Sequence, residues 1–119
     1  MSARILVVED EAPIRELLVT LLRTHGHRTS AAANGALALA RVGEERPDLV
    51  LADVMMPVLS GLELCRRLKA DPATAAVPVL LMSAVDARYV DGAGADGFVP
   101  KPFELDQLEA LIDRWLATG

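Results

Sequence analysis

The chain has 119 residues, 52% of them hydrophobic, and a net charge of −5 at pH 7. This length predicts one domain over residues 1–119, large enough to bury a hydrophobic core. The apolar stretches are too short to cross a bilayer, and Arg66-Arg67 is the longest basic cluster, so we expect neither a membrane partner nor direct binding of nucleic acid. Cys65 is the only cysteine, which excludes an internal disulfide, and a strand-like segment follows Met1 too closely for a signal peptide. These features predict a cytoplasmic protein.

The first third of the chain predicts a strand, a helix and a second strand. Ile5–Val8 is a short apolar run, and a helix follows it, with Pro13 in its first turn and Gly26 at its end. Arg28–Ala32 is a polar strand, whose weak apolar character predicts a sheet edge. The inward positions of the helix, at i, i+3, i+4, i+7 and i+8, are Ile14, Leu17, Leu18, Leu21 and Leu22.

The same alternation continues to the end of the chain. A helix over Ala36–Glu45 ends before Pro47, and the apolar run Asp48–Asp53 is typical of a strand buried on both faces. A third helix begins at Ser60-Gly61 and ends near Asp71, and a last helix begins near Glu104. Further strands are predicted over Val77–Met82 and Gly97–Val99. The inward positions of these helices are Leu39, Val42, Leu64, Cys65, Leu68, Leu105, Leu108, Leu111, Ile112 and Trp115.

The segment between Ser83 and Lys101 leaves room for a helix of about two turns. Its glycines at 92, 94 and 97 each disfavour a helix by up to ~1 kcal/mol relative to alanine, so this helix is predicted to be the shortest and loosest. Pro100 places the following strand at an edge, where a missing N–H is tolerated. Strands that alternate with helices in this way predict an α/β fold, a doubly wound parallel sheet with helices on both faces.

Charged residues follow three of the predicted strands. Glu9 and Asp10 follow the first, Asp53 ends the third, and Lys101 follows the last. If the strands are parallel, these groups meet at the carboxyl edge of the sheet, where open α/β sheets bind ligands. Two like charges 4 Å apart repel by ~4 kcal/mol at an effective dielectric near 20, and one lysine relieves only part of this. The oxygen ligands therefore predict a Mg²⁺ site, with Mn²⁺ as an alternative ion.

Four motifs, each at a strand end, together resemble the receiver domain of two-component response regulators, of the kind found in chemotaxis regulators. They are Val7-Val8-Glu9-Asp10-Glu11, Asp53-Val54-Met55-Met56-Pro57 followed by Gly61, Ser83-Ala84, and Lys101-Pro102-Phe103. The resemblance runs from about Arg4 to Leu116. It implies a flavodoxin-like, three-layer α/β/α fold with a five-stranded parallel sheet of order 2-1-3-4-5 and five helices. Against this pattern, the segment between Ser83 and Lys101 is about one helical turn short.

The resemblance also implies a chemistry, in which Asp53 accepts a phosphoryl group from the phosphohistidine of a sensor histidine kinase or phosphotransfer protein. Phosphorylation would then switch binding to an output partner or domain that the sequence does not identify, with homodimerisation as one form of output. The metal ligands that it implies are Glu9, Asp10, Asp53 and the backbone carbonyl of Met55. The phosphoryl-binding residues that it implies are Lys101, Ser83 and Ala84. Ser83 and Phe98 would be the switch residues, and Lys101-Pro102 would be a cis peptide.

Other interpretations stay open at the level of sequence. Ser83 also fits an ordinary turn hydroxyl, and Phe98 fits a packing residue. The chain could be a receiver-like interaction or dimerisation module that is never phosphorylated, although the full set of acids and Lys101 argues against it. An aspartyl phosphohydrolase would usually need a second acid where Met55 stands, and a flavodoxin would need a hydroxyl-rich phosphate loop. We therefore expect a phosphorylation switch that assists its own phosphorylation and dephosphorylation, and no metabolic enzyme.

Overall fold

The computed structural model describes residues 3–56, 58–84 and 94–118. Its strands form one parallel sheet of order β2-β1-β3-β4-β5, which confirms the predicted doubly wound, flavodoxin-like fold. The strands are β1 (Arg4–Val8), β2 (Arg28–Ala32), β3 (Leu49–Asp53), β4 (Val79–Ser83) and β5 (Gly97–Pro100). The helices of the described residues are α1 (Ala12–Thr24), α2 (Gly35–Glu44), α3 (Gly61–Ala70) and α4 (Leu105–Thr118).

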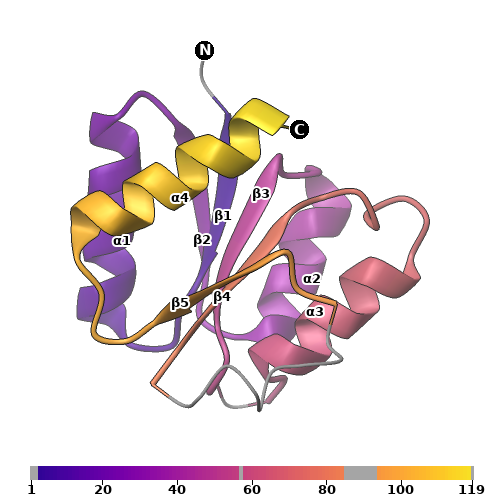
Figure 1. Cartoon of the computed structure of the whole chain (residues 1–119). Helices are drawn as coiled ribbons and strands as arrows, with labels where there is room; N and C mark the ends of the chain where they lie inside the picture. Colours follow the sequence, from indigo (N-terminus) through magenta and orange to yellow (C-terminus); the bar gives the residue numbers. More distant parts are fainter. Residues whose placement is uncertain (1–2, 57, 85–93, 119) are drawn as a thin grey trace.

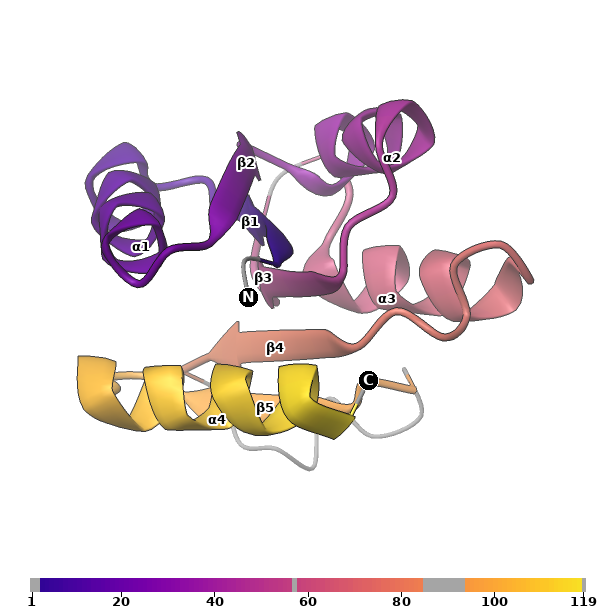
Figure 2. The ribbon, with the colours of Figure 1, turned by 90° about the horizontal axis from the view of Figure 1, so that it is seen from above.

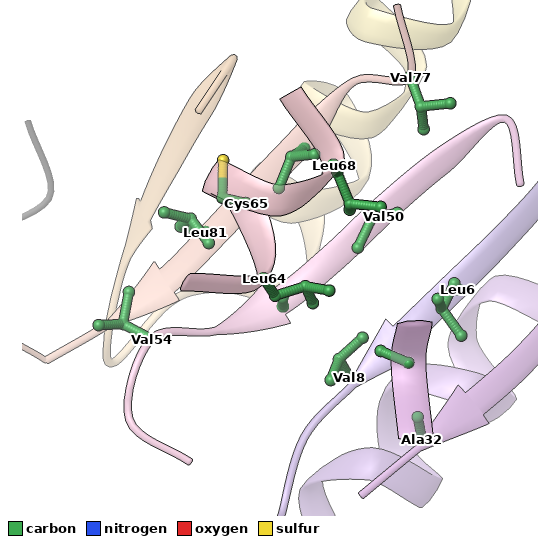
Figure 3. Packing of buried hydrophobic residues seen from close by; sticks show 13 residues of the cluster. Leu6, Val8, Ala32, Val50, Val54, Leu64, Cys65, Leu68, Val77 and Leu81 are labelled. Atoms are coloured by element: carbon green, nitrogen blue, oxygen red, sulfur yellow. The ribbon is translucent and has the colours of Figure 1, made fainter. Parts of the chain in front are cut away.

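The sheet lies between two helical layers, with α1 and α4 on one face and α2 and α3 on the other (Figures 1 and 2). Successive strand residues point to opposite faces, so Ile5 and Val7 join one core cluster while Leu6 and Val8 join the other. Figure 3 shows the cluster on the α2–α3 side, where Leu64, Cys65 and Leu68 of α3 contact the sheet. Each fully buried large aliphatic side chain contributes about 1.5–3 kcal/mol to folding. Two such clusters hold the strand ends in fixed positions.

The strand register determines which residues meet at the carboxyl edge. Val8 pairs with Ala52, so the next residues along the two strands, Glu9 and Asp53, become neighbours. Asp53 in turn pairs with Met82 of β4. Ser83 pairs with Pro100, which places Lys101 directly beyond the end of β5. At the opposite edge, β1 begins and α4 ends close together (top of Figure 1).

Most predicted elements are confirmed, including both edge strands, β2 and β5. The fourth strand begins two residues later than predicted, because Pro78 has no N–H to donate and Val77 donates its N–H to the Thr74 carbonyl at 3.0 Å. The prediction that Leu17 faces inward is wrong, because Leu17 is 51% exposed. The predicted short helix between Ser83 and Lys101 lies largely outside the described residues. Among the described helices, none is long and apolar enough to span a membrane.

The loop between β3 and α3 is tightly constrained. A Cβ at Gly61 would overlap the backbone carbonyl oxygen of Asp53, so the helix can start this close to the strand only with glycine there. Within the same loop, Val58 has φ of 70° and is 82% exposed. A β-branched residue is strained in this left-handed region, and its exposed side chain gains little from packing.

We predict that Val58→Asn stabilises the fold, because asparagine tolerates the left-handed conformation at little cost. The expected gain in the free energy of unfolding is about 1 kcal/mol, measured by urea denaturation. Val58→Ala is the matched control, because alanine removes the branched side chain but keeps most of the backbone strain. A stability of Val58→Asn equal to or below that of the wild type would contradict this explanation.

Candidate functional site

Three carboxylates converge at the carboxyl edge of the sheet. Glu9 and Asp10 follow β1, and Asp53 is the last residue of β3. One carboxylate oxygen from each lies within 4.8 Å of the others. Glu9 is fully buried, Asp53 is 7% exposed and Asp10 is exposed to solvent. The predicted acidic cluster is therefore present, with one member open to solvent.

Lys101 contacts two of these acids at once. Its Nζ donates to Oε1 of Glu9 and to Oδ2 of Asp53, in each case at 3.2 Å. The Lys101 backbone N–H donates to the carbonyl of Ser83 at 2.8 Å, which fixes the start of the side chain against the end of β4. Burial lowers the pKa of the Lys101 ammonium, but the hydrogen bonds and charges of the two acids outweigh it and raise that pKa. The lysine therefore stays charged across the physiological range.

Glu9 is held in a position that disfavours its charge. Burial, and then the neighbouring Asp53 carboxyl, raise the pKa of Glu9 to about 7, and Lys101 offsets only part of this rise. Within the part of the chain that the structure describes, Oε2 of Glu9 is buried and has no hydrogen-bond partner. An unpaired buried carboxylate oxygen is costly, so a further positive charge at this site would be stabilising.

A small divalent cation would supply this positive charge. The three acids offer hard oxygen ligands from separate strand ends, and Asp10 is open to solvent, which suits an ion that keeps several of its waters. The unpaired Oε2 of Glu9 shows that Lys101 alone does not satisfy the cluster. The residues present therefore fit a Mg²⁺ site.

Met55 lies in the loop beyond Asp53, and its residue is 68% exposed. Its backbone N–H donates to Oδ1 of Asp53 at 3.3 Å, so the two oxygens of the Asp53 carboxylate have different partners, Met55 for one and Lys101 for the other. The Met55 backbone thus lies beside Asp53, and the role of its carbonyl as a metal ligand stays a prediction from the resemblance.

The other predicted site residues lie on β4, on β5 and just beyond these strands. Ser83 is buried at the end of β4, and the next residue, Ala84, is exposed and shares an apolar cavity with Lys101. Phe98 is half-buried and packs against the core on the α2–α3 side, in β5, which β4 separates from the strand of Asp53. The Lys101–Pro102 peptide bond is cis.

The structure also brings two residues to this region that the sequence did not indicate. Arg15 of α1 donates from Nη1 to the backbone carbonyl of Glu9 at 2.9 Å. Leu17, on the same helix, lines an apolar cavity of about 460 Å³ that reaches Lys101. In the sequence, Leu17 was indistinguishable from the core positions of α1, and the contact made by Arg15 had no signature in spacing.

Comparisons with known proteins agree with this geometry. The family model described as response regulator receiver domain matches residues 5–113. The DNA-binding response regulator MtrA of Mycobacterium tuberculosis (strain ATCC 25618 / H37Rv) is 40% identical over 116 residues, which are 94% of this chain and 50% of MtrA. The chain thus spans about half the length of this curated relative.

Solved structures of similar fold include receivers of different proteins. The signal receiver domain of a signal transduction histidine kinase from Syntrophus aciditrophicus has a TM-score of 0.93 and 34% identity, covering 98% of this chain and 92% of that one. Response regulator TrrA from Thermotoga maritima, solved in complex with Mg²⁺-BeF, has a TM-score of 0.86 and 34% identity, covering 97% and 99%. The fold, the acidic edge and the family match lead to one conclusion: the chain belongs to the response regulator receiver domain family, the phosphoacceptor modules of two-component signalling.

Proposed function

We propose that the 119 residues form one receiver domain in which Asp53 is the phosphoacceptor. The observation that carries the proposal is the ammonium of Lys101, held at 3.2 Å from both Glu9 and Asp53 beside a cluster of acids that fits a metal ion. Asp53 keeps 7% exposure, and so an approaching phosphoryl group can reach it. An ordinary structural ion pair would need neither the third acid nor the unpaired oxygen of Glu9.

In the proposed step, a carboxylate oxygen of Asp53 attacks the phosphorus of a phosphohistidine. The O–P bond forms as the P–N bond breaks, and the electron pair of that bond stays on the imidazole nitrogen that leaves. The protein adds little covalent chemistry beyond the nucleophile, so positioning and neutralisation of charge dominate the rate. Lys101 would hold one phosphoryl oxygen, and its Nζ, within hydrogen-bond reach of the attacking carboxylate, supports this role. Ser83 and Ala84, at the end of β4, would bind another.

Glu9, Asp10, Asp53 and the Met55 carbonyl would hold Mg²⁺, or Mn²⁺ in its place. The ion would neutralise charge on the phosphoryl oxygens during transfer and during hydrolysis of the acyl phosphate. Hydrolysis in this site would make the domain a switch that assists its own phosphorylation and dephosphorylation. We propose that Ser83 and Phe98 respond to the phosphoryl group and change the surface near β5, where Phe98 lines a cavity of about 440 Å³ beside α4.

Incubation with acetyl phosphate and Mg²⁺ should add one phosphate to the wild-type protein and none to Asp53→Asn, because asparagine lacks the nucleophilic oxygen. Intact-protein mass spectrometry measures the label. Asp48→Asn is the matched control, since Asp48 precedes the same strand at its opposite end, and it should be labelled like the wild type. Labelling of Asp53→Asn at the wild-type level would rule out Asp53 as the acceptor.

The raised pKa of Glu9 predicts a pH dependence. A carboxyl whose pKa is higher in the folded state stabilises the fold below its unfolded value, near 4.5, and loses this contribution as pH rises through about 7. Mg²⁺ needs the deprotonated form, so its stabilising effect should be larger at pH 8 than at pH 5.5. Thermal melts with and without Mg²⁺ at the two pH values test this.

Glu9→Gln is the control for that measurement, because glutamine cannot titrate. Its gain in melting temperature from Mg²⁺ should be smaller than that of the wild type at pH 8 and should change less between the two pH values. Equal stabilisation of the wild type by Mg²⁺ at both pH values would contradict the proposed role of Glu9.

An apolar surface lies next to the site. Receiver domains interact with histidine kinases, and Leu17 is 51% exposed beside the apolar cavity that reaches Lys101. We propose that an apolar side chain of the kinase or phosphotransfer protein enters this cavity and contacts Leu17.

We use a histidine kinase that phosphorylates the wild type. Leu17→Glu should lower the rate of phosphotransfer from this kinase about tenfold, because the loss of one apolar contact of about 1.4 kcal/mol has this effect. Labelling by acetyl phosphate should be unchanged, because no docking is needed. Leu37→Glu is the matched control, since Leu37 is equally exposed but lies on α2. Equal rates from the kinase for Leu17→Glu and Leu37→Glu would argue against this surface.

The chain spans only part of a relative that carries a further function. MtrA is described as DNA-binding and the chain spans half of it, so we propose that phosphorylation of this receiver controls an output partner or domain, directly or through homodimerisation. The net charge of −5 favours a receiver that does not itself bind nucleic acid. A cytoplasmic location would fit a free, buried Cys65 and a phosphohistidine donor.

A further inference from the structure

The backbone of Glu9 is held from two sides. Its N–H donates to the carbonyl of Ala32 at 3.1 Å and extends the pairing of β1 with β2 by one residue. Its carbonyl accepts a hydrogen bond from Nη1 of Arg15 at 2.9 Å. That carbonyl belongs to the peptide group joining Glu9 to Asp10, so the guanidinium fixes the orientation of the peptide from which the Asp10 side chain departs.

The loop of Glu9, Asp10 and Glu11 joins β1 to α1. Among the described residues, the N-cap residue Glu11 makes no side-chain capping hydrogen bond, and the first turn of α1 contains no acidic residue. Arg15 therefore connects the start of the helix to the end of β1 across the loop that carries Asp10. It is half-buried, which limits the conformations open to its side chain.

We propose that Arg15 is a positioning residue of the Mg²⁺ site, which holds the Glu9–Asp10 peptide so that the exposed carboxylate of Asp10 stays within reach of Glu9 and Asp53. The inference deepens the proposed function and rests on its metal site. Residues that orient metal ligands typically change metal affinity by 10–100-fold when removed.

Positioning and simple electrostatics predict opposite results here. A guanidinium near the site repels Mg²⁺, so removal of its charge alone would tighten metal binding. Removal of its hydrogen bond would let the loop vary and would weaken binding. The sign of the change in affinity therefore distinguishes the two roles.

The test is a Mg²⁺ titration of the wild type, Arg15→Gln and Arg41→Gln by isothermal titration calorimetry. Arg41 is a matched control, because it lines the same cavity of about 430 Å³ as Arg15 but its ion-pair partner, at 3.9 Å, is Glu44 of the same helix. We expect the dissociation constant to rise about tenfold for Arg15→Gln and to stay near the wild-type value for Arg41→Gln. Arg15→Lys should recover part of the loss, since its ammonium donor lies one atom farther along the side chain than the amide donor of glutamine and comes closer to the reach of Nη1.

A second measurement separates positioning from a general loss of structure. In acetyl phosphate labelling, Arg15→Gln should need about tenfold more Mg²⁺ for half of the maximal rate and reach the wild-type rate at saturating Mg²⁺. A lower melting temperature with unchanged Mg²⁺ affinity would overturn the inference, as would tighter binding. Asp10→Asn tests the site itself: if it binds Mg²⁺ as tightly as the wild type, or the wild type binds none, the proposed metal site fails together with this inference. If Arg15→Gln binds Mg²⁺ like the wild type while Asp10→Asn binds it more weakly, the inference about Arg15 fails but the metal site is supported.

Discussion

The ammonium of Lys101 is the interaction on which the edge of the sheet depends. Glu9 and Asp53 emerge from adjacent strands at neighbouring positions, and two unit charges about 4 Å apart repel by ~4 kcal/mol at an effective dielectric near 20. Lys101 reaches both from beyond the last strand, at 3.2 Å each. Among the residues that the structure describes, one oxygen of Glu9 still has no hydrogen-bond partner, so the lysine offsets only part of the negative charge. That balance makes the edge receptive to a cation and a phosphoryl group.

The sequence predicted the fold well because hydrophobic pattern and topology are closely linked in this class. The strands β1, β3 and β4 are buried on both faces and read as continuous apolar runs, and the polar Arg28–Ala32 segment correctly indicated an edge. Once the strands are parallel and the crossovers right-handed, residues that follow strands must gather at one edge. The acid cluster and Lys101 were predictable for this reason, before any side-chain geometry was known.

The remaining errors and omissions of the sequence analysis concern local contacts that residue spacing does not describe. Leu17 shares the spacing of the buried leucines of α1, but the buried stripe of the helix centres on Leu18 and Leu22, and its flank opens to a cavity. The contact between Arg15 and the Glu9 carbonyl joins a helix to a loop, and no periodicity describes such a contact. Pro78 shifted the start of β4 because its missing N–H acts on one rung of the ladder. Local hydrogen bonding of this kind depends on the folded backbone.

Both ends of the described chain lie at the amino edge of the sheet, opposite the acids (Figure 1). A five-residue strand spans roughly 17 Å, so both ends lie at about that distance or more from Asp53. A segment attached at either end would therefore begin on the far side of the sheet from the acceptor. If phosphorylation is to affect such a segment, the structural change must pass from Asp53 through the packed layers of the domain or around its flank.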